Sequence, residues 1–213
     1  MRLALPKGRV LTPVLDALAA AGIAPEGLGG ADPDNGGRRL WLDLPGSAHE
    51  ALLLKSWDVP RYVERGIADW GFVGSDVLGE VGGDLLAPLA LTAGRCRMSL
   101  IGRPGSALPA AGGQARVATK YPATARRLVA ARPWGAEVLA LAGSVELAPL
   151  LDLADYALDI VETGATLRAH GLIELEAVAE VEPLVVVNRA AFHHRREEIN
   201  DLIGRLEAAG VAE

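Results

Sequence analysis

One nine-residue stretch, Asp159 to Leu167, combines side chains that could bind a phosphorylated sugar. It carries Asp159 and Glu162 on an apolar strand and continues directly into a Thr-Gly-x-Thr turn. A glycine lets the backbone approach an anion closely, and threonine hydroxyls and the free N–H groups of an opening helix can point at the same phosphate oxygens. Carboxylates suit the two hydroxyls of a ribose, or a magnesium ion held by pyrophosphate. The stretch therefore predicts a site for a ribose 5-phosphate.

The same turn has a purely structural interpretation, in which it connects a strand to a helix with Thr163 as the N-cap. Patterns of this length are common by chance. The preceding strand favours the binding interpretation, because Asp159 lies among apolar residues, where an acid without a partner is costly.

Composition limits the classes of protein to which the chain can belong. Its 213 residues, half of them hydrophobic, suffice for one large domain or two small ones. A net charge of -6 and an aromatic content of 4% argue against a nucleic-acid partner. No apolar run approaches the roughly 20 residues of a membrane span, and no signal peptide opens the chain. We therefore expect a cytoplasmic protein without a membrane or nucleic-acid partner.

Several kinds of site lack their usual signatures. The single cysteine, Cys96, excludes an internal disulfide and a cysteine-based zinc site, and we interpret it as a buried thiol. The histidines do not have the spacing of metal ligands, so no metal site made by side chains is expected. No Gly-x-Ser-x-Gly elbow, Walker lysine loop or Gly-x-Gly-x-x-Gly fingerprint is present, which removes the usual support for hydrolases and dehydrogenases.

Hydrophobic periodicity predicts alternating strands and helices, the pattern of an α/β protein. The expected strands of the first half lie at residues 2–6, 40–44, 51–54, 69–73 and 85–91. A helix that begins near Pro13 should end at Gly22, and short helices should follow residues 58 and 74. The expected strands of the second half lie at residues 98–102, 116–119 and 137–141 and around Asp159, with helices opened by Pro122 and by residues 143–146.

The last part of the chain is expected to return to the first. Residues 174–187 form two β-like stretches around Pro183, and a helix with apolar residues from Ile199 to Leu206 should pack on the first lobe. Two α/β lobes follow from this pattern, one of residues 1–92 with 182–213 and one of residues 93–181. A ligand site in a cleft between the lobes would be typical of such folds.

Basic residues fall at predicted strand ends and loop edges, where α/β proteins bind small anions. Lys7 and Arg9 follow the first strand, although Lys7-Gly8-Arg9 could also be a solvated turn. The full set is Lys7, Arg9, Lys55, Arg95, Arg97, Lys120 and Arg168.

Several segments, taken in order, closely resemble the ATP phosphoribosyltransferases of histidine biosynthesis in their short form. They cover nearly the whole chain. The matching segments are 4–9, Asp58-Val59-Pro60 with Tyr62-Val63-Glu64, the glycine-rich 66–76, Gly94-Arg95-Cys96-Arg97, Arg116 to Pro122, Gly143 to Pro149, Leu153-Ala154-Asp155, and Thr163 to Leu167 with Gly171-Leu172.

The resemblance implies a two-lobed fold like that of type II periplasmic binding proteins, with ATP and phosphoribosyl pyrophosphate in the cleft. The implied reaction joins N1 of adenine to C1 of the ribose with inversion and releases pyrophosphate, which carries Mg2+. Long members of the family have a further regulatory domain that binds histidine. Short members resemble this chain in lacking it, and they depend on a separate subunit similar to histidyl-tRNA synthetase. A homo-oligomer within such a hetero-oligomer is expected.

The chemistry of this reaction suggests a role for each candidate residue. Backbone N–H groups and hydroxyls of the threonine turn would hold the 5-phosphate, Asp159 would take the ribose hydroxyls with Asp155 or Glu162 as helper, and cations would neutralise the polyphosphate. Asp76 could instead be a turn former. The predicted substrate site comprises Asp155, Asp159, Glu162, Thr163, Gly164, Ala165, Thr166 and Leu167; the polyanion site comprises Lys7, Arg9, Lys55 and Asp76; the catalytic residues are Lys7, Arg9 and Asp159.

The chain departs from the family pattern at a few positions. Asp152 stands where glycine is usual, Ala157 replaces a branched aliphatic residue, Lys55 replaces a more frequent arginine and Ser56 a proline. Lys55 keeps the charge of arginine but not its bidentate geometry. Two other functions fit the same architecture: a non-catalytic sensor that binds a phosphorylated ligand, and a purely structural subunit.

Overall fold

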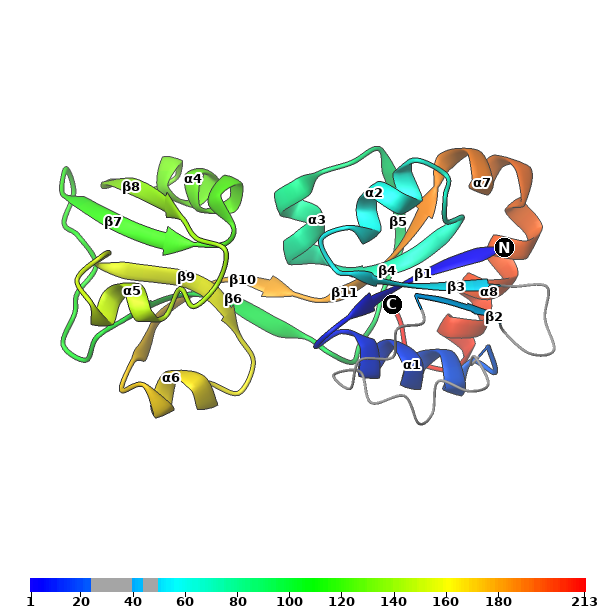
Figure 1. Ribbon diagram of the computed structural model, residues 1–213, viewed down its shortest axis with the longest axis horizontal. Helices are drawn as coiled ribbons and strands as arrows, with labels where there is room; N and C mark the ends of the chain where they lie inside the picture. The colour runs from blue at the N-terminus through cyan, green and yellow to red at the C-terminus, as the bar shows by residue number, and fades with distance from the viewer. Residues whose placement is uncertain (24–39, 44–49) are drawn as a thin grey trace. The chain divides into compact units, whose positions relative to one another are not determined.

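The computed structural model describes residues 1–23, 40–43 and 50–213. It divides into two compact units (Figure 1). Unit 1 comprises Met1–Arg95 and Glu182–Glu213, and unit 2 comprises Cys96–Val181. The sequence-based boundary after residue 92 therefore lies slightly before the boundary in the structure. Because the chain leaves unit 1 once and returns to it, unit 1 is discontinuous in sequence whereas unit 2 is continuous.

Unit 1 is built on a six-stranded mixed sheet in the order β2-β3-β1-β4-β11-β5. Its strands are β1 (Arg2–Lys7), β2 (Trp41–Asp43), β3 (Glu50–Lys55), β4 (Trp70–Gly74), β5 (Leu85–Ala90) and β11 (Pro183–Asn188). Strands β3, β1 and β4 are parallel, whereas β2 is antiparallel to β3 and β11 is antiparallel to both β4 and β5. Strand β11, from the far end of the chain, thus lies between two strands of the first part.

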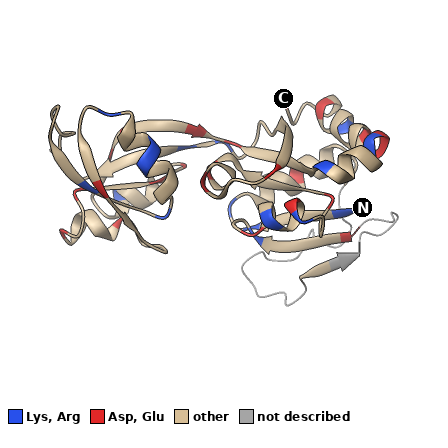
Figure 2. Ribbon diagram, turned by 90° about the horizontal axis from the view of Figure 1, so that it is seen from above, with Lys and Arg blue, Asp and Glu red and all other residues tan. Residues whose placement is uncertain are grey.

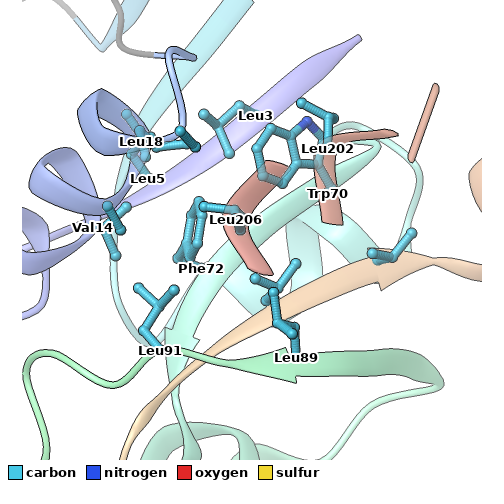
Figure 3. Packing of buried hydrophobic residues seen from close by; sticks show 14 of the residues in the cluster. Leu3, Leu5, Val14, Leu18, Trp70, Phe72, Leu89, Leu91, Leu202 and Leu206 are labelled. Atoms are coloured by element: carbon cyan, nitrogen blue, oxygen red, sulfur yellow. The ribbon is translucent and has the colours of Figure 1, made fainter. Parts of the chain in front are cut away.

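The helices of unit 1 cover both faces of this sheet. They are α1 (Leu11–Ala20), α2 (Val59–Glu64), α3 (Ser75–Val81), α7 (Arg189–His194) and α8 (Arg196–Ala208). Successive side chains of a strand point to opposite faces. Accordingly, Leu3 and Leu5 pack in one cluster with α1 and α8, and Ala4 packs in the other with α2 and α3. Figure 3 shows the first cluster, with Phe72 and Leu206 near its centre.

Unit 2 is built on a five-stranded sheet in the order β10-β6-β9-β7-β8. Its elements are β6 (Cys96–Gly102), β7 (Gln114–Thr119), α4 (Pro122–Ala130), β8 (Gly135–Ala140), α5 (Leu147–Leu150), β9 (Tyr156–Val161), α6 (Ala165–Ala169) and β10 (Ile173–Val181). Strands β8, β7 and β9 are parallel, and β6 runs antiparallel to its neighbours β9 and β10. A core cluster that includes Ile101, Val161 and Leu172 lies under α6.

The predicted alternation of strands and helices is confirmed in both units. The buried residues Ile199, Leu202 and Leu206 of α8 belong to the unit 1 core, as the helical spacing predicted. The segment 143–146 precedes a helix, α5, that starts only at Leu147. Helix α7 was not predicted, and the end of the expected strand at 40–44 lies outside the described residues.

Charged residues of both signs are interspersed over both units (Figure 2). Within the described part of the chain, no helix is long and apolar enough to cross a membrane.

Candidate active site

The parallel strands of unit 2 end at the same edge of its sheet. Thr119, at the end of β7, is in register with Ala140 on β8 and with Leu158 on β9. The connections that follow these strands therefore start at this edge, including the Thr-Gly-x-Thr turn after β9. The carboxyl ends of parallel strands are the usual place for ligand binding in α/β folds.

The Thr-Gly-x-Thr turn bends the chain at a left-handed glycine just before helix α6. Gly164 has φ 70°, in the left-handed region, and is the N-cap of α6. The hydroxyl oxygen of Thr163 accepts a hydrogen bond from the Ala165 N–H at 3.3 Å, and the Arg168 guanidinium donates to the Thr163 carbonyl at 3.0 Å. Thr163, Ala165 and Thr166 are exposed, so solvent or a ligand can reach this turn.

Leu167 plays a different part from the four residues before it. Its side chain is 8% exposed and packs in the unit 2 core with Val161 and Leu172. The structure therefore gives Leu167 the role of anchoring the start of α6, and its side chain does not face a ligand.

Asp159 lies near the end of β9, held by two donors on one oxygen. Its Oδ1 is 3.2 Å from the ammonium of Lys120, which directly follows β7, and accepts a hydrogen bond from the Ile160 N–H at 2.8 Å. The Asp159 side chain is 19% exposed. The acid in this apolar strand thus has a cationic partner just after the neighbouring strand, and its side chain is still partly exposed.

The two helper carboxylates of the prediction lie at opposite ends of β9. Glu162 is exposed and follows the strand beside the threonine turn. Asp155 precedes the strand, about 13 Å from Asp159 for four residues of extended chain. It accepts a hydrogen bond from the Arg116 N–H and pairs with the Arg116 guanidinium at 3.2 Å, and these contacts lower the pKa of its carboxyl, chiefly through the side-chain hydrogen bond. The structure therefore separates Asp155 from Asp159 and Glu162.

In unit 1, two of the predicted polyanion-binding residues lie side by side. Lys7 at the end of β1 and Lys55 at the end of β3 are direct partners in a parallel pair. The hydroxyl of Ser56 donates a hydrogen bond to the Lys7 carbonyl at 3.1 Å, which ties the two strand ends together. Like charges on directly paired residues of neighbouring strands are unfavourable, and a bound polyanion would offset that cost.

Arg9 and Asp76 are engaged with the protein itself. The Arg9 guanidinium donates to the Gly94 carbonyl at 2.9 Å. Asp76 is 9% exposed and lies in the first turn of α3, so close to the backbone that a Cβ at Gly74 would collide with its carboxylate.

Comparison with known proteins decides the family. The HisG family model, described as ATP phosphoribosyltransferase, matches residues 55–208. The chain belongs to the ATP phosphoribosyltransferase family. An ATP phosphoribosyltransferase of Thermus thermophilus is 43% identical over 206 residues, covering 97% of this chain and 95% of the relative. One of Methylococcus capsulatus is 44% identical over 207 residues, with 97% and 94% covered.

A solved structure gives the same assignment. The "ATP phosphoribosyl transferase (HisG:HisZ) complex from Thermotoga maritima" contains a chain that is 32% identical, with a TM-score of 0.79 and 98% of each chain covered. This likeness confirms the predicted fold class, two α/β lobes of the type II periplasmic-binding-protein kind. Family membership also confirms the predicted enzyme class, a pentosyl transfer that begins histidine biosynthesis, and favours it over the sensor and structural alternatives.

Some interactions of polar residues in the ATP phosphoribosyltransferase motifs could be recognised only in the structure. Arg97 on β6 makes a two-pronged pair with Glu174 on β10, at 2.6 and 2.5 Å, and the buried Ser99 hydroxyl donates to the same carboxylate at 2.9 Å. Arg97, followed by the Ser99 hydroxyl, holds the pKa of Glu174 below its ordinary value. Because 77 residues separate Arg97 from Glu174, no local spacing could have indicated this pair.

The carboxyl ends of the parallel strands carry most of the candidate ligand residues. At the amino ends of these strands, each sheet has a pocket. A pocket of about 360 Å³ is lined by residues that include Arg2, Glu50 and Asp69, at the amino ends of β1, β3 and β4. Another of about 330 Å³ is lined by residues that include Arg116 and Asp155. The predicted ligand residues other than Asp155 lie at the other edges, where the family chemistry is expected. Among the described residues, no group of three or more His, Cys, Asp or Glu side chains could hold a metal ion.

Proposed function

We propose that the chain binds phosphoribosyl pyrophosphate through unit 2 and polyphosphate through the lysine pair of unit 1, and transfers the phosphoribosyl group to N1 of ATP. The observation that carries this proposal is the sequence of groups along β9 and the turn after it. A carboxylate near the strand end is followed by a left-handed glycine and two exposed threonines.

The threonine turn is proposed to bind the 5-phosphate. The left-handed Gly164 supports this role because such residues occur in backbone N–H concavities that bind anions, and the exposed hydroxyls of Thr163 and Thr166 can add further donors. Hydrogen bonds from neutral donors to a charged phosphate are charge-assisted, so several of them around one phosphate give affinity. The cation of the turn, Arg168, is bound to the Thr163 carbonyl and thereby supports the loop.

Asp159 is proposed to accept hydrogen bonds from the ribose diol, with Glu162 as its helper. Asp155 is left out, because its carboxylate pairs with Arg116 at the other end of the strand. Of the two helper candidates, Glu162 alone lies at the same end of β9 as the phosphate turn.

Lys7 and Lys55 are proposed to neutralise a polyphosphate. Lysine acts as a point charge, which suits a flexible chain of phosphates. Mg2+ belongs to this proposal as part of the substrate, because pyrophosphate oxygens and water supply the octahedral oxygen set that it prefers. Arg9 keeps guanidinium donors beyond the one that binds Gly94, so it can join the lysines without releasing that contact.

The proposed chemistry asks little of protein acids or bases. Adenine N1 already has a lone pair, so it can form the bond to C1 of the ribose while the C1–oxygen bond breaks and its electron pair leaves with pyrophosphate. Positioning of the two reactants and stabilisation of the departing charge would lower the barrier. The residues discussed above act by those two means.

The proposal includes a regulatory partner and an oligomer. The similar chain of Thermotoga maritima is described as part of a HisG:HisZ complex, which supports a partner subunit that resembles histidyl-tRNA synthetase for this chain. Homo-oligomers within that assembly belong to the same proposal. A cytoplasmic location does too, since highly charged substrates do not cross a membrane unaided.

The decisive experiment measures pyrophosphate release from ATP and phosphoribosyl pyrophosphate, with and without the partner subunit. We expect release that requires both substrates, together with a KM for phosphoribosyl pyrophosphate that rises at least tenfold in Thr163→Ala and Asp159→Asn. Binding of both substrates without turnover, even with the partner present, would instead indicate a sensor. Unchanged affinity in both variants would refute the proposed sugar-phosphate site while leaving the family assignment intact.

A further inference from the structure

Lys120 is held in place by contacts on both sides of it in the chain. The buried Thr119 hydroxyl donates to the Leu158 carbonyl at 2.7 Å and accepts a hydrogen bond from the Tyr121 N–H at 2.9 Å. The residues before and after Lys120 are thereby fixed to the residue that precedes Asp159. The Lys120 ammonium also lies 5.5 Å from the centre of the Tyr121 ring, and that ring is buried. These contacts hold the backbone on both sides of Lys120 and place its ammonium group beside the Asp159 carboxylate.

The contact that results is specific to one oxygen of Asp159. Lys120 and the Ile160 N–H both bind Oδ1. The terminal torsion of an aspartate is broad when nothing restrains it. Two donors on Oδ1 restrain that torsion, and Oδ2 is then the oxygen that neither of them engages.

We propose that Lys120 is a positioning residue for phosphoribosyl transfer, which fixes Asp159 so that Oδ2 meets the vicinal diol of the sugar phosphate. The inference rests on the proposed function, since it deepens the role given there to Asp159. A preorganised carboxylate loses no further rotational freedom when the diol binds, which strengthens binding. The same contact balances the negative charge of Asp159 with the positive charge of Lys120.

A second ion pair on the same strand provides a matched control. Arg116 and Asp155 pair at the opposite end of β9, and their charged groups are also 3.2 Å apart. That pair is more exposed, with 43% of each side chain accessible, against 34% and 19% for Lys120 and Asp159. Removing Lys120 or Arg116 breaks one ion pair at an end of β9. The positioning role predicts a loss of substrate affinity only when Lys120 is removed.

The test uses the full chain, with phosphoribosyl pyrophosphate binding measured by calorimetry and initial rates measured in the presence of the partner subunit. Lys120→Met should weaken binding by about tenfold, the scale on which supporting side chains affect the groups they orient. Its kcat should fall by less than its KM rises. Lys120→Arg should recover most of the affinity, and Arg116→Met should bind like the unaltered chain. Thermal unfolding of each variant establishes that it is folded.

A double-mutant cycle with Asp159→Asn separates indirect action from direct contact with substrate. If Lys120 acts through Asp159, adding Lys120→Met to Asp159→Asn should cause no further loss of affinity. A full additional loss would overturn the inference, as would an Arg116→Met variant that binds as weakly as Lys120→Met. If Asp159→Asn weakens binding and Lys120→Met does not, the inference alone fails. If Asp159→Asn binds normally, the proposed role of Asp159 itself fails.

Discussion

At the scale of single residues, Asp152 carries a backbone conformation that most side chains avoid. Its φ is 59°, and its carboxylate accepts a hydrogen bond from Arg103 at 2.7 Å. The family resemblance leads us to expect glycine at this position, and glycine adopts a left-handed φ without strain. Aspartate is among the few other residues that tolerate this region, because its short polar side chain can bond locally.

Replacing Asp152 should separate the backbone requirement from the ion pair. Asp152→Ala keeps a Cβ in the left-handed conformation and loses the pair, so we expect it to lower the free energy of unfolding by about 1 kcal/mol. Asp152→Gly relieves the strain, which offsets the lost surface pair and the added freedom of the unfolded chain, so it should stay close to the unaltered protein. Urea unfolding of both variants at equal m-value measures the difference. Equal stability of the two would mean that the conformation is not strained.

At the scale of elements, β1 and β4 approach each other so closely that a side chain does not fit between them. A Cβ on Gly71 would lie 2.7 Å from the Ala4 carbonyl oxygen and 2.8 Å from the Ala4 Cβ. The first of these is a backbone atom of a buried strand, which cannot move aside without shifting the sheet. The strand end that carries Lys7 depends on this packing.

Gly71→Ala should therefore lower the free energy of unfolding by about 2–3 kcal/mol, the usual cost of overpacking a core. A control in the opposite direction is Gly204→Ala in α8, where a Cβ would meet nothing within 4 Å. That change should raise stability by roughly 0.5–1 kcal/mol, because glycine in a helix interior is unfavourable. Chemical denaturation of the two variants measures both changes in the free energy of unfolding, which should have opposite signs. A neutral Gly71→Ala would show that β1 and β4 can separate freely.

A second element-scale prediction concerns the Arg97–Glu174 contact that joins β6 to β10. Because the pKa of Glu174 is lowered from 4.5 by Arg97 first and by Ser99 second, folded protein binds fewer protons than unfolded protein near that pH. The contact therefore contributes its full stability above pH 4.5, and the contribution is lost as the pH falls through the lowered folded value.

Glu174→Gln should be less stable than the unaltered chain at pH 7 but should lose less stability on acidification. Ser99→Ala removes one of the two side-chain donors to Glu174, so its acid dependence should lie between those of the other two proteins. Urea midpoints between pH 7 and pH 3 measure these slopes. Parallel curves for all three proteins would contradict the assignment.

The elements illustrate what sequence patterns can and cannot predict. The strand that contains Asp159 and the turn at Gly164 were predictable, because apolar runs and glycine report local backbone geometry. The position of Asp155 was not, since nearness in sequence suggested a shared site whereas an extended strand carries the residue away from Asp159. Helix α7 was missed because six residues are too few for a helical period to stand out. Pairs such as Lys120 with Asp159 depend on which strands become neighbours, and single-strand patterns do not contain that information.

At the scale of the whole molecule, the two units differ in how the chain builds them. Unit 2 is one continuous segment with its own core, and its candidate ligand residues lie at the end of β9 and in the turn that follows. Unit 1 needs both ends of the chain, because β11 lies between β4 and β5 and because α8 supplies the buried residues Leu202 and Leu206. A fragment of residues 1–95 would lack an internal strand and one cover of its core.

This difference predicts the behaviour of separated fragments. Residues 96–181 should fold alone, with a cooperative thermal transition and dispersed amide resonances, whereas residues 1–95 should not, since β5 has lost its partner β11 and the Leu3 face is left uncovered. Adding residues 182–213 to the fragment of residues 1–95 should restore the fold of unit 1. The isolated unit 2 should also bind phosphoribosyl pyrophosphate, weakly and in a manner that Thr163→Ala abolishes, because the proposed 5-phosphate and diol contacts all come from it. A folded unit 2 that shows no binding would mean that those contacts are insufficient without the cations of unit 1.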